Sequence, residues 1–123
     1  MFIPPFAHIQ ADEQTTSGLL SFLFHFLLQT PRAYQAIREE VDRVCGATPI
    51  KFEQLQKLEY IDAALKEAMR IKSTAPGISF TPKDKDEVIG GKYLVPKDHH
   101  VMVVLDALHT DPKVWGDDAH EFR

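Results

Sequence analysis

The 123-residue sequence lacks the features that define several common classes of protein. Its single cysteine, Cys45, cannot close an internal disulfide, which excludes a disulfide-stapled secreted domain and favours a reducing compartment. The longest apolar run, Leu19 to Leu28, has ten residues, whereas a spanning helix needs about 20. Residues 1–10 lack the basic start of a signal peptide. We therefore expect a cytoplasmic protein without a membrane span, and peripheral contact with a membrane stays open.

Basic charge is scarce as well. There are 14 Lys and Arg against 18 Asp and Glu, and the formal net charge is −4 at pH 7. A protein that binds nucleic acid needs clustered basic residues, so we expect no nucleic-acid partner. The six histidines include no His-x-x-x-His pair, and we expect no metal site built from them, which leaves a histidine-based metal hydrolase as a distant alternative. The 44% hydrophobic content is typical of one folded domain.

The sequence up to Thr30 predicts one long helix. The adjacent prolines at positions 4 and 5 remove backbone donors, so the pattern predicts a start after them, between Ala7 and Asp12. Residues 19–28 are apolar around nearly the whole circumference, which is typical of a helix at the centre of a large protein. Its polar residues Ser21, His25 and Gln29 follow one another at intervals of four and form a single stripe.

Two further helical segments follow. Thr30-Pro31 is typical of a helix start, with a capping hydroxyl before a proline at the first helical position. The second helix is predicted over Arg32–Cys45 and ends at Gly46, and Phe52–Lys72 is predicted to be largely helical. Cys45 at the end of the second helix is interpreted as a buried structural thiol.

The remainder of the sequence predicts a small β-region. Strands are expected at Ile78–Thr81, at Glu87–Ile89 and Lys92–Val95 around a two-residue Gly90-Gly91 turn, and at Val101–Leu105, which reads as a buried strand. A short helical piece through His109 and turns at Asp111-Pro112 and Trp115–Asp118 complete the chain. The predicted fold class is mainly α, with the helices first and the small β-region after them.

Two local patterns have both a structural and a functional interpretation. Glu67-x-x-Arg70 places a carboxylate and a guanidinium one helical turn apart, but Glu40-x-x-Arg43 has the same spacing, and a solvated surface pair is the simplest interpretation of either. A function requires that something buries the Glu67 pair. Thr15-Thr16 is unusual inside a helix, and it indicates either a local bend or a frayed first turn.

Six segments in this order resemble a known family. They are Ala11–Leu20, Glu67–Arg70, Thr74–Phe80, Gly90–Tyr93, Leu108–Pro112 and Trp115–Arg123. The set is similar to the cytochrome P450 family of haem-thiolate monooxygenases, and within it to the fatty-acid hydroxylases that carry a fused flavin reductase. The resemblance implies a partial cytochrome P450 domain over residues 11–123, preceded by an atypical segment over residues 1–10.

The resemblance also implies a set of site residues. The catalytic residues would be Thr15, Gln14 and Glu13, with Ala11 and Thr15 against the haem. The substrate pocket would include Ala75, Pro76, Gly77 and Ile78, and Glu67 and Arg70 would form a structural ion pair inside the protein. The implied cofactor is haem, the implied electron donor is a fused or separate flavoprotein reductase, and the implied reaction inserts oxygen into a C–H bond of a lipophilic, fatty-acid-like substrate.

The sequence departs from the family pattern at three places. Asp12 stands where the family has a glycine that faces the haem, and Gln14 stands where it has an acid, so no titratable proton is available there unless Glu13 or Asp12 substitutes. The family's Phe-x-x-Gly-x-Arg-x-Cys-x-Gly loop does not occur in these residues, and Cys45 does not match it. We therefore expect a fragment that is inactive alone. The alternative is a truncated relic or a protein-interaction module that uses its apolar helix.

Overall fold

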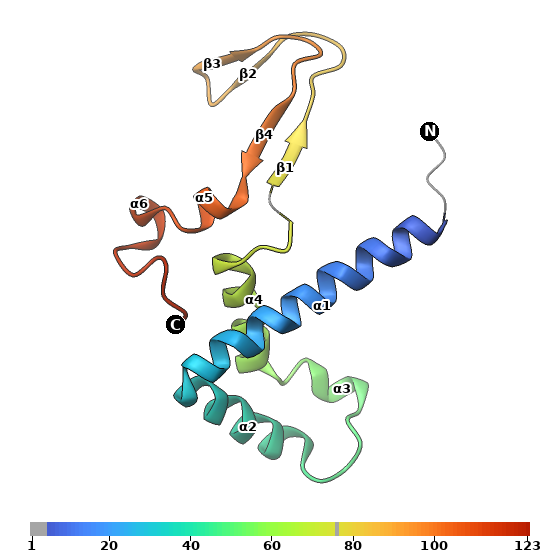
Figure 1. The fold of residues 1–123 in the computed structure, drawn as a ribbon, viewed down its shortest axis with the longest axis vertical. Helices are drawn as coiled ribbons and strands as arrows, with labels where there is room; N and C mark the ends of the chain where they lie inside the picture. Colours follow the sequence, from blue (N-terminus) through green and yellow to red (C-terminus); the bar gives the residue numbers. More distant parts are fainter. Residues whose placement is uncertain (1–4, 76) are drawn as a thin grey trace.

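The computed structural model describes the backbone of residues 5–75 and 77–123 and the side chains of residues 14–75 and 77–123. Its helices are α1 (Pro5–Gln29), α2 (Pro31–Cys45), α3 (Phe52–Leu55), α4 (Glu59–Ile71), α5 (Leu105–His109) and α6 (Pro112–Trp115). Its strands are β1 (Gly77–Phe80), β2 (Glu87–Ile89), β3 (Tyr93–Val95) and β4 (Val101–Val104). The mainly α fold class with a small β-region is therefore confirmed. Figure 1 shows α1 crossing α4 and meeting α2 at its end, with the strands forming an arm that extends from the helices.

Helix α1 begins earlier than the two prolines predicted. It starts at Pro5 itself, because a proline at the first helical position lacks only a donor that the helix leaves unpaired in any case. Thr15 consequently lies well inside the helix, and the interpretation of Thr15-Thr16 as a frayed first turn is wrong. Within the described ranges, no helix combines the length and the apolar content that a membrane crossing requires.

The junction between α1 and α2 differs in one detail from the predicted cap. Pro31 is the first residue of α2, and the Thr30 carbonyl accepts from the backbone N–H groups of Ala33 and Tyr34 at 3.0 and 3.2 Å. The Thr30 hydroxyl makes no capping hydrogen bond, however, so the proline rather than the hydroxyl marks the start. At the other end, Gly46 has φ +62° and closes α2, as its position predicted.

The predicted helix over residues 52–72 is divided in two. The chain leaves the helical path after α3, and Leu58 precedes α4 as a non-helical residue. Leu58 is only 6% exposed, so the residue at the break is buried in the interior. The tertiary environment of Leu58 thus overrides the helical periodicity of residues 52–72.

Two antiparallel pairs form the arm. β1 pairs with β4 with Gly77 opposite Val104, and β2 pairs with β3 with Ile89 opposite Tyr93. The turn between β2 and β3 contains three residues instead of the predicted two, with both glycines at positive φ. The prediction that β4 is buried is wrong: its Met102 is 64% exposed, because no layer covers a two-stranded sheet.

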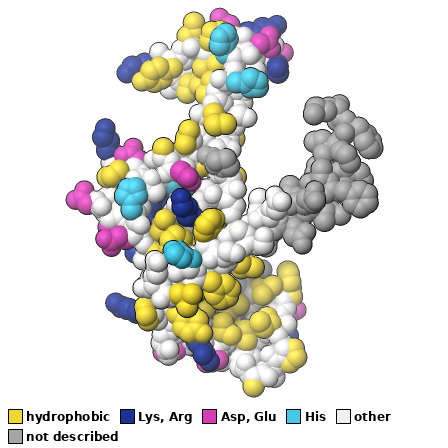
Figure 2. Space-filling view, viewed as in Figure 1, with side chains coloured by type: hydrophobic (Ala, Val, Ile, Leu, Met, Phe, Trp, Pro, Cys, Tyr) yellow, Lys and Arg dark blue, Asp and Glu magenta, His cyan; other side chains and the backbone are white. Residues whose placement is uncertain are grey.

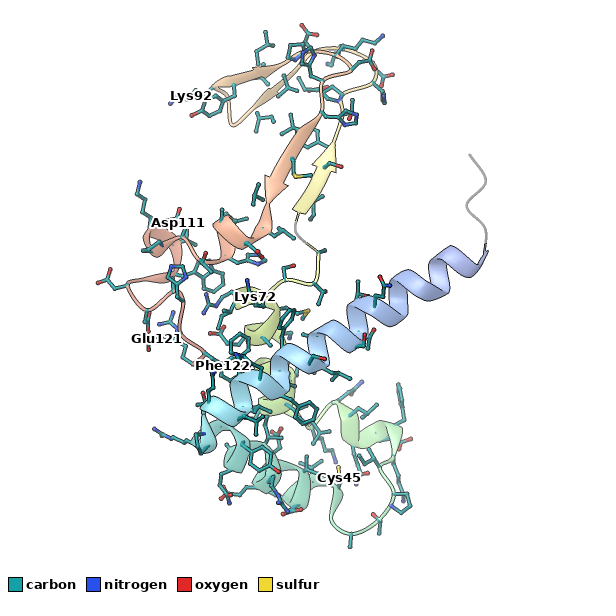
Figure 3. All side chains as sticks on the ribbon, in the orientation of Figure 1. Cys45, Lys72, Lys92, Asp111, Glu121 and Phe122 are labelled. Atoms are coloured by element: carbon teal, nitrogen blue, oxygen red, sulfur yellow. The ribbon has the colours of Figure 1, made fainter. Side chains whose placement is uncertain are left out.

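The core lies where α1, α2 and α4 meet. It consists of Leu23, Leu27, Ala33, Ala64 and Ala68. The C-terminal segment returns to this core, and Phe122 stacks on Phe26 of α1 with ring centroids 5.2 Å apart. Figure 3 shows Phe122 beside α1 and α4. The helices and the end of the chain thus share one packed centre.

Gly77 offers a direct test of the β1–β4 pairing. A Cβ at this position would lie 2.5 Å from the Val103 carbonyl oxygen, so Gly77→Ala is expected to lower the free energy of unfolding by about 1–3 kcal/mol. Urea unfolding followed by circular dichroism measures this change. Gly18→Ala is the control, because its Cβ would meet only Thr74 Cγ2 at 3.4 Å inside a helix and should stabilise by up to about 1 kcal/mol. Equal stability of the two variants would contradict the register.

Candidate functional site

Helix α4 places Glu67 and Arg70 one turn apart as a bidentate ion pair. Arg70 Nε donates to Glu67 Oε2 at 2.8 Å, and an Arg70 terminal nitrogen donates to Glu67 Oε1 at 2.8 Å. The Arg70 side chain is 5% exposed and the Glu67 side chain 16%, so Arg70 is buried, Glu67 is partly buried, and the two do not form a solvated surface pair. The two parallel hydrogen bonds fix the guanidinium plane relative to α4.

The other Arg70 donors hold the C-terminal segment. One terminal nitrogen donates to the carbonyl oxygens of His109 and Ala119 at 2.8 and 2.5 Å, and the second donates to that of Glu121 at 3.0 Å. A guanidinium has five N–H donors, and together with the two bonds to Glu67 all five are used. We call this arrangement the Arg70 clamp: Glu67, Arg70 and the three carbonyl groups.

Three contacts complete the surroundings of the Arg70 clamp. The Trp115 ring lies against the guanidinium, with 4.9 Å between the guanidinium carbon and the ring centroid. Arg123 donates to the Trp115 carbonyl oxygen at 2.9 Å and pairs with Asp118 at 2.5 Å. The segment from α5 to the last residue is therefore folded around one buried guanidinium.

The charge of Arg70 is stabilised by its surroundings. Hydrogen bonding to Glu67 raises the pKa of the Arg70 guanidinium above its ordinary value, burial opposes this rise, and the negative charges of Glu67 and Asp118 add to it. Because the pKa is raised in the folded state, the stabilisation is complete below the ordinary pKa of arginine and is lost only as pH rises through the raised value. The guanidinium therefore stays charged at every pH near neutrality.

Two of the residues that the resemblance implies on α1 lie on an exposed stretch of the helix. Gln14 and Thr15 are both exposed, and the Gln14 backbone carbonyl accepts from the Ser17 hydroxyl at 3.2 Å. Ala11 and Glu13 belong to α1, but their side chains lie outside the described ones. The proposed proton-delivery role of this group stays a prediction.

The segment after α4 passes close to the same part of α1. Thr74 Cγ2 lies 3.4 Å from the position a Cβ would take on Gly18, one turn from Thr15. Of the predicted substrate-pocket residues, Ala75 is exposed, Gly77 begins β1, and Ile78 is 61% exposed, whereas Pro76 lies outside the described residues. The described part of this segment thus begins beside the turn of α1 that carries Thr15, and its role in substrate binding stays a prediction.

An open, mainly apolar groove lies between α1 and the end of α4. Its volume is about 400 Å³, and it is lined by Ser21, Phe22, His25, Phe26, Ile71 and Lys72. Ser21 and His25 of the predicted polar stripe line it, and His25 Nε2 lies 3.3 Å from Nε2 of Gln29, the third residue of the stripe. Figure 3 shows Lys72 where α4 ends beside α1.

The fit to haem can be tested on the donor atoms. Cys45, the sole cysteine of the sequence, is 5% exposed at the end of α2, and Figure 3 places it beside α2 and α3, on the other side of α1 from Lys72. Among residues 14–75 and 77–123, no group of three or more His, Cys, Asp and Glu side chains could hold a metal ion. A haem-thiolate site needs one accessible cysteine sulfur, and the sole cysteine is buried, so the described residues do not fit such a site.

Sequence reasoning missed two residues that organise this region. Glu40 is 6% exposed although its spacing to Arg43 suggested a surface pair, and Arg43 contacts it only at 3.8 Å. A signal was present, since Glu40 falls on the same helix face as Ala33 and Ile37. Trp115 was expected only in a turn, and its contact with Arg70 had no local signal because 45 residues separate the two.

Comparison with known proteins gives a consistent result. A family model described as cytochrome P450 matches residues 10–123. A self-sufficient cytochrome P450 monooxygenase of Penicillium camemberti is 50% identical over 113 residues, and a bifunctional cytochrome P450/NADPH–P450 reductase of Acremonium egyptiacum is 43% identical over 118 residues. A bifunctional protein of the same description from Alternaria alternata is 44% identical. Each match covers 92% of this chain, which spans about a tenth of the length of these relatives.

Proposed function

This chain belongs to the cytochrome P450 family, and on that premise we propose that it forms part of a monooxygenase that inserts oxygen into a C–H bond of a lipophilic, fatty-acid-like substrate. The observation that carries the proposal is the match to the family over residues 10–123. The relatives at 42–50% identity carry names of self-sufficient monooxygenases and of P450/reductase fusions, which supports an activity of the same class. The cofactor of such a protein is haem.

We assign the α1 residues to proton handling in that protein. The Thr15 hydroxyl both donates and accepts hydrogen bonds, so it can hold a water molecule at the surface of α1. Gln14 can orient such a water but has no titratable proton, and Glu13 is the neighbouring acid that could supply one. Ala11 would lie against the cofactor. Beside this turn, Ala75, Pro76, Gly77 and Ile78 would contact an apolar substrate.

We further propose that the electrons come from a flavoprotein reductase, fused or separate. Three of the relatives carry the names of bifunctional P450/NADPH–P450 reductases, which favours a fused arrangement. A cytoplasmic location suits a chain whose one cysteine is a buried free thiol. Both assignments concern the protein to which this chain contributes.

Sequencing the transcript in both directions from the codons of Met1 and Arg123 tests the proposal. We expect an in-frame Phe-x-x-Gly-x-Arg-x-Cys-x-Gly segment downstream, because the described residues supply no axial thiolate. A stop codon directly after Arg123 would contradict membership of a working monooxygenase and would favour the non-catalytic alternative. Oxygen insertion into a fatty acid by the complete protein then tests the substrate class.

The 123-residue chain by itself is expected to show no thiolate-bound haem. Mixed with haem, reduced and exposed to carbon monoxide, it should lack the red-shifted Soret band of a thiolate-ligated ferrous complex, because Cys45 is buried and no other cysteine exists. Absorption spectroscopy measures the band position. A red-shifted band that disappears in Cys45→Ser would show that Cys45 reaches the iron, and would overturn this expectation.

A second candidate function is protein binding through an apolar surface. Leu20, Phe24 and Leu28 form a stripe along α1 and are 45%, 57% and 81% exposed. The accessible surface of the chain is 9733 Å², whereas a compact monomer of 14.0 kDa exposes about 6,700 Å². Figure 2 shows apolar side chains gathered over the helical part of the molecule. Such a surface is typical of one that another polypeptide covers.

We expect the isolated chain to associate with itself through this stripe. Sedimentation velocity over a range of concentrations should show reversible association, and Phe24→Glu should weaken it by about tenfold or more, because a charge then enters an apolar contact. Val88→Glu is the matched control, since Val88 is 58% exposed on the β-arm. A wild-type chain that sediments as a monomer at every concentration would argue against this second function.

A further inference from the structure

Two charged side chains are buried in the part of the chain whose side chains are described, and both act on the same helix. Glu40 of α2 is 6% exposed, and Arg70 of α4 is 5% exposed. Arg70 lies in the last turn of α4, whereas Glu40 reaches the first turn of α4 from a different helix. The Arg70 clamp described above includes Arg70, whereas neither the clamp nor the proposed function gives Glu40 a role.

Glu40 closes the N-terminus of α4. Its Oε1 accepts from the Tyr60 backbone N–H at 2.9 Å, and its Oε2 accepts from those of Tyr60 and Ile61, each at 3.0 Å. The residue before α4 is Leu58, whose side chain has no acceptor. The carboxylate thus supplies both the missing cap and a negative charge at the positive end of the helix dipole.

We propose that Glu40 is a positioning residue, which sets the start of α4 and thereby the place of the Arg70 clamp at its other end. Helix α4 has 13 residues and is a rigid rod about 20 Å long. A shift by one residue would move Arg70 by about 1.5 Å and turn it by about 100°. The three carbonyl groups could not follow such a shift without new backbone positions, so the two ends of α4 are set together.

The neighbouring charge does not account for the burial of Glu40. Arg43 approaches Glu40 Oε1 only to 3.8 Å, and its side chain is 71% exposed, so this contact is screened by solvent. The close partners of the carboxylate are all backbone N–H groups of α4. A purely local cap and a positioning residue differ in one respect. Only for a positioning residue does a change at Glu40 weaken the hydrogen bonds of Arg70.

Hydrogen exchange of the full chain measured by NMR distinguishes these roles. In the wild type, the Tyr60 and Ile61 amides should exchange at least about 100-fold more slowly than solvent-exposed amides, although first-turn amides usually face water. Glu40→Gln keeps the shape but has one acceptor oxygen, and it should speed exchange of these amides and of Arg70 Nε–H by about tenfold or more. Glu39→Gln is the matched control: Glu39 is exposed, accepts from Gln35, and its change should leave all three rates unaltered.

Three outcomes would overturn the proposal. Unprotected Tyr60 and Ile61 amides in the wild type would show that Glu40 does not cap α4. Faster exchange at these amides with unchanged exchange at Arg70 Nε–H would make Glu40 a local cap only. If Glu40→Gln does not fold, the wild type decides: Tyr60 N–H and Arg70 Nε–H should open with the same urea dependence, and different dependences reject the coupling. None of these results depends on the proposed monooxygenase activity, which the transcript tests separately.

Discussion

Replacing Arg70 by methionine is expected to lower the free energy of unfolding by about 3–5 kcal/mol. The change leaves the Glu67 carboxylate, whose side chain is 16% exposed, without its charged partner. It also removes the donors of three backbone carbonyl groups between α5 and the last residues, and unmet buried acceptors are costly. Since a domain of this size has a total stability of about 5–15 kcal/mol, this loss is a large share of it. Urea unfolding monitored by circular dichroism measures the loss.

The second Glu-x-x-Arg pair of this chain supplies the control. Arg43→Met removes an arginine with the same spacing to a glutamate, but Arg43 is exposed and its contact is 3.8 Å long, so its loss should cost no more than about 1 kcal/mol. Arg70→Lys should recover only a small part of the stability, because an ammonium cannot serve five acceptors in a plane. If Arg70→Met and Arg43→Met unfold at the same urea concentration, the clamp does not hold the C-terminal segment.

Leu27→Ala is expected to lower the free energy of unfolding by about 3 kcal/mol. Leu27 is 4% exposed and belongs to the core between α1, α2 and α4, so truncation removes apolar burial and leaves a cavity. The adjacent Leu28 is 81% exposed, and Leu28→Ala should change the stability by less than about 0.5 kcal/mol. Thermal and urea unfolding of the two variants compare the same chemical change at neighbouring positions.

The contrast between these two leucines also checks the rotation of α1. A helix turned by one residue would exchange the two positions and reverse the ranking of the variants. A larger loss for Leu28→Ala would therefore contradict the packing of α1. It would equally contradict the exposed stripe proposed for protein binding, since Leu28 is part of it.

The order and type of the main elements could be predicted from the sequence because they depend on local periodicity. The limits of α2 and the two strands around Gly90-Gly91 follow from caps, turns and alternation. The break before α4 could not be predicted, since it depends on the burial of Leu58 by other parts of the chain. The start of α1 was misplaced because a proline was treated as excluded from the first turn that accommodates it.

The candidate site likewise has features that the local sequence predicts and features that depend on distant residues. The spacing of Glu67 and Arg70 was visible, but their burial depends on carbonyl groups 39 to 51 residues further along the chain from Arg70. The acceptor role of Glu40 was missed because its partners lie 20 and 21 residues away. Local sequence therefore indicates which groups can pair, whereas the tertiary fold decides which pairs are buried.

The Arg70 clamp also sets an order of events during synthesis. Glu67 and Arg70 are three residues apart and can pair as soon as α4 forms, whereas the carbonyl groups of Ala119 and Glu121 are synthesised about 50 residues later. Closing that long loop is slow relative to helix formation. In a nascent chain, the Glu67–Arg70 pair can thus form before the carbonyl groups that complete the Arg70 clamp have been synthesised. Until residue 122 emerges, the Phe26 ring lacks the Phe122 ring that stacks on it, whereas α1, α2 and α4 can already pack their shared core.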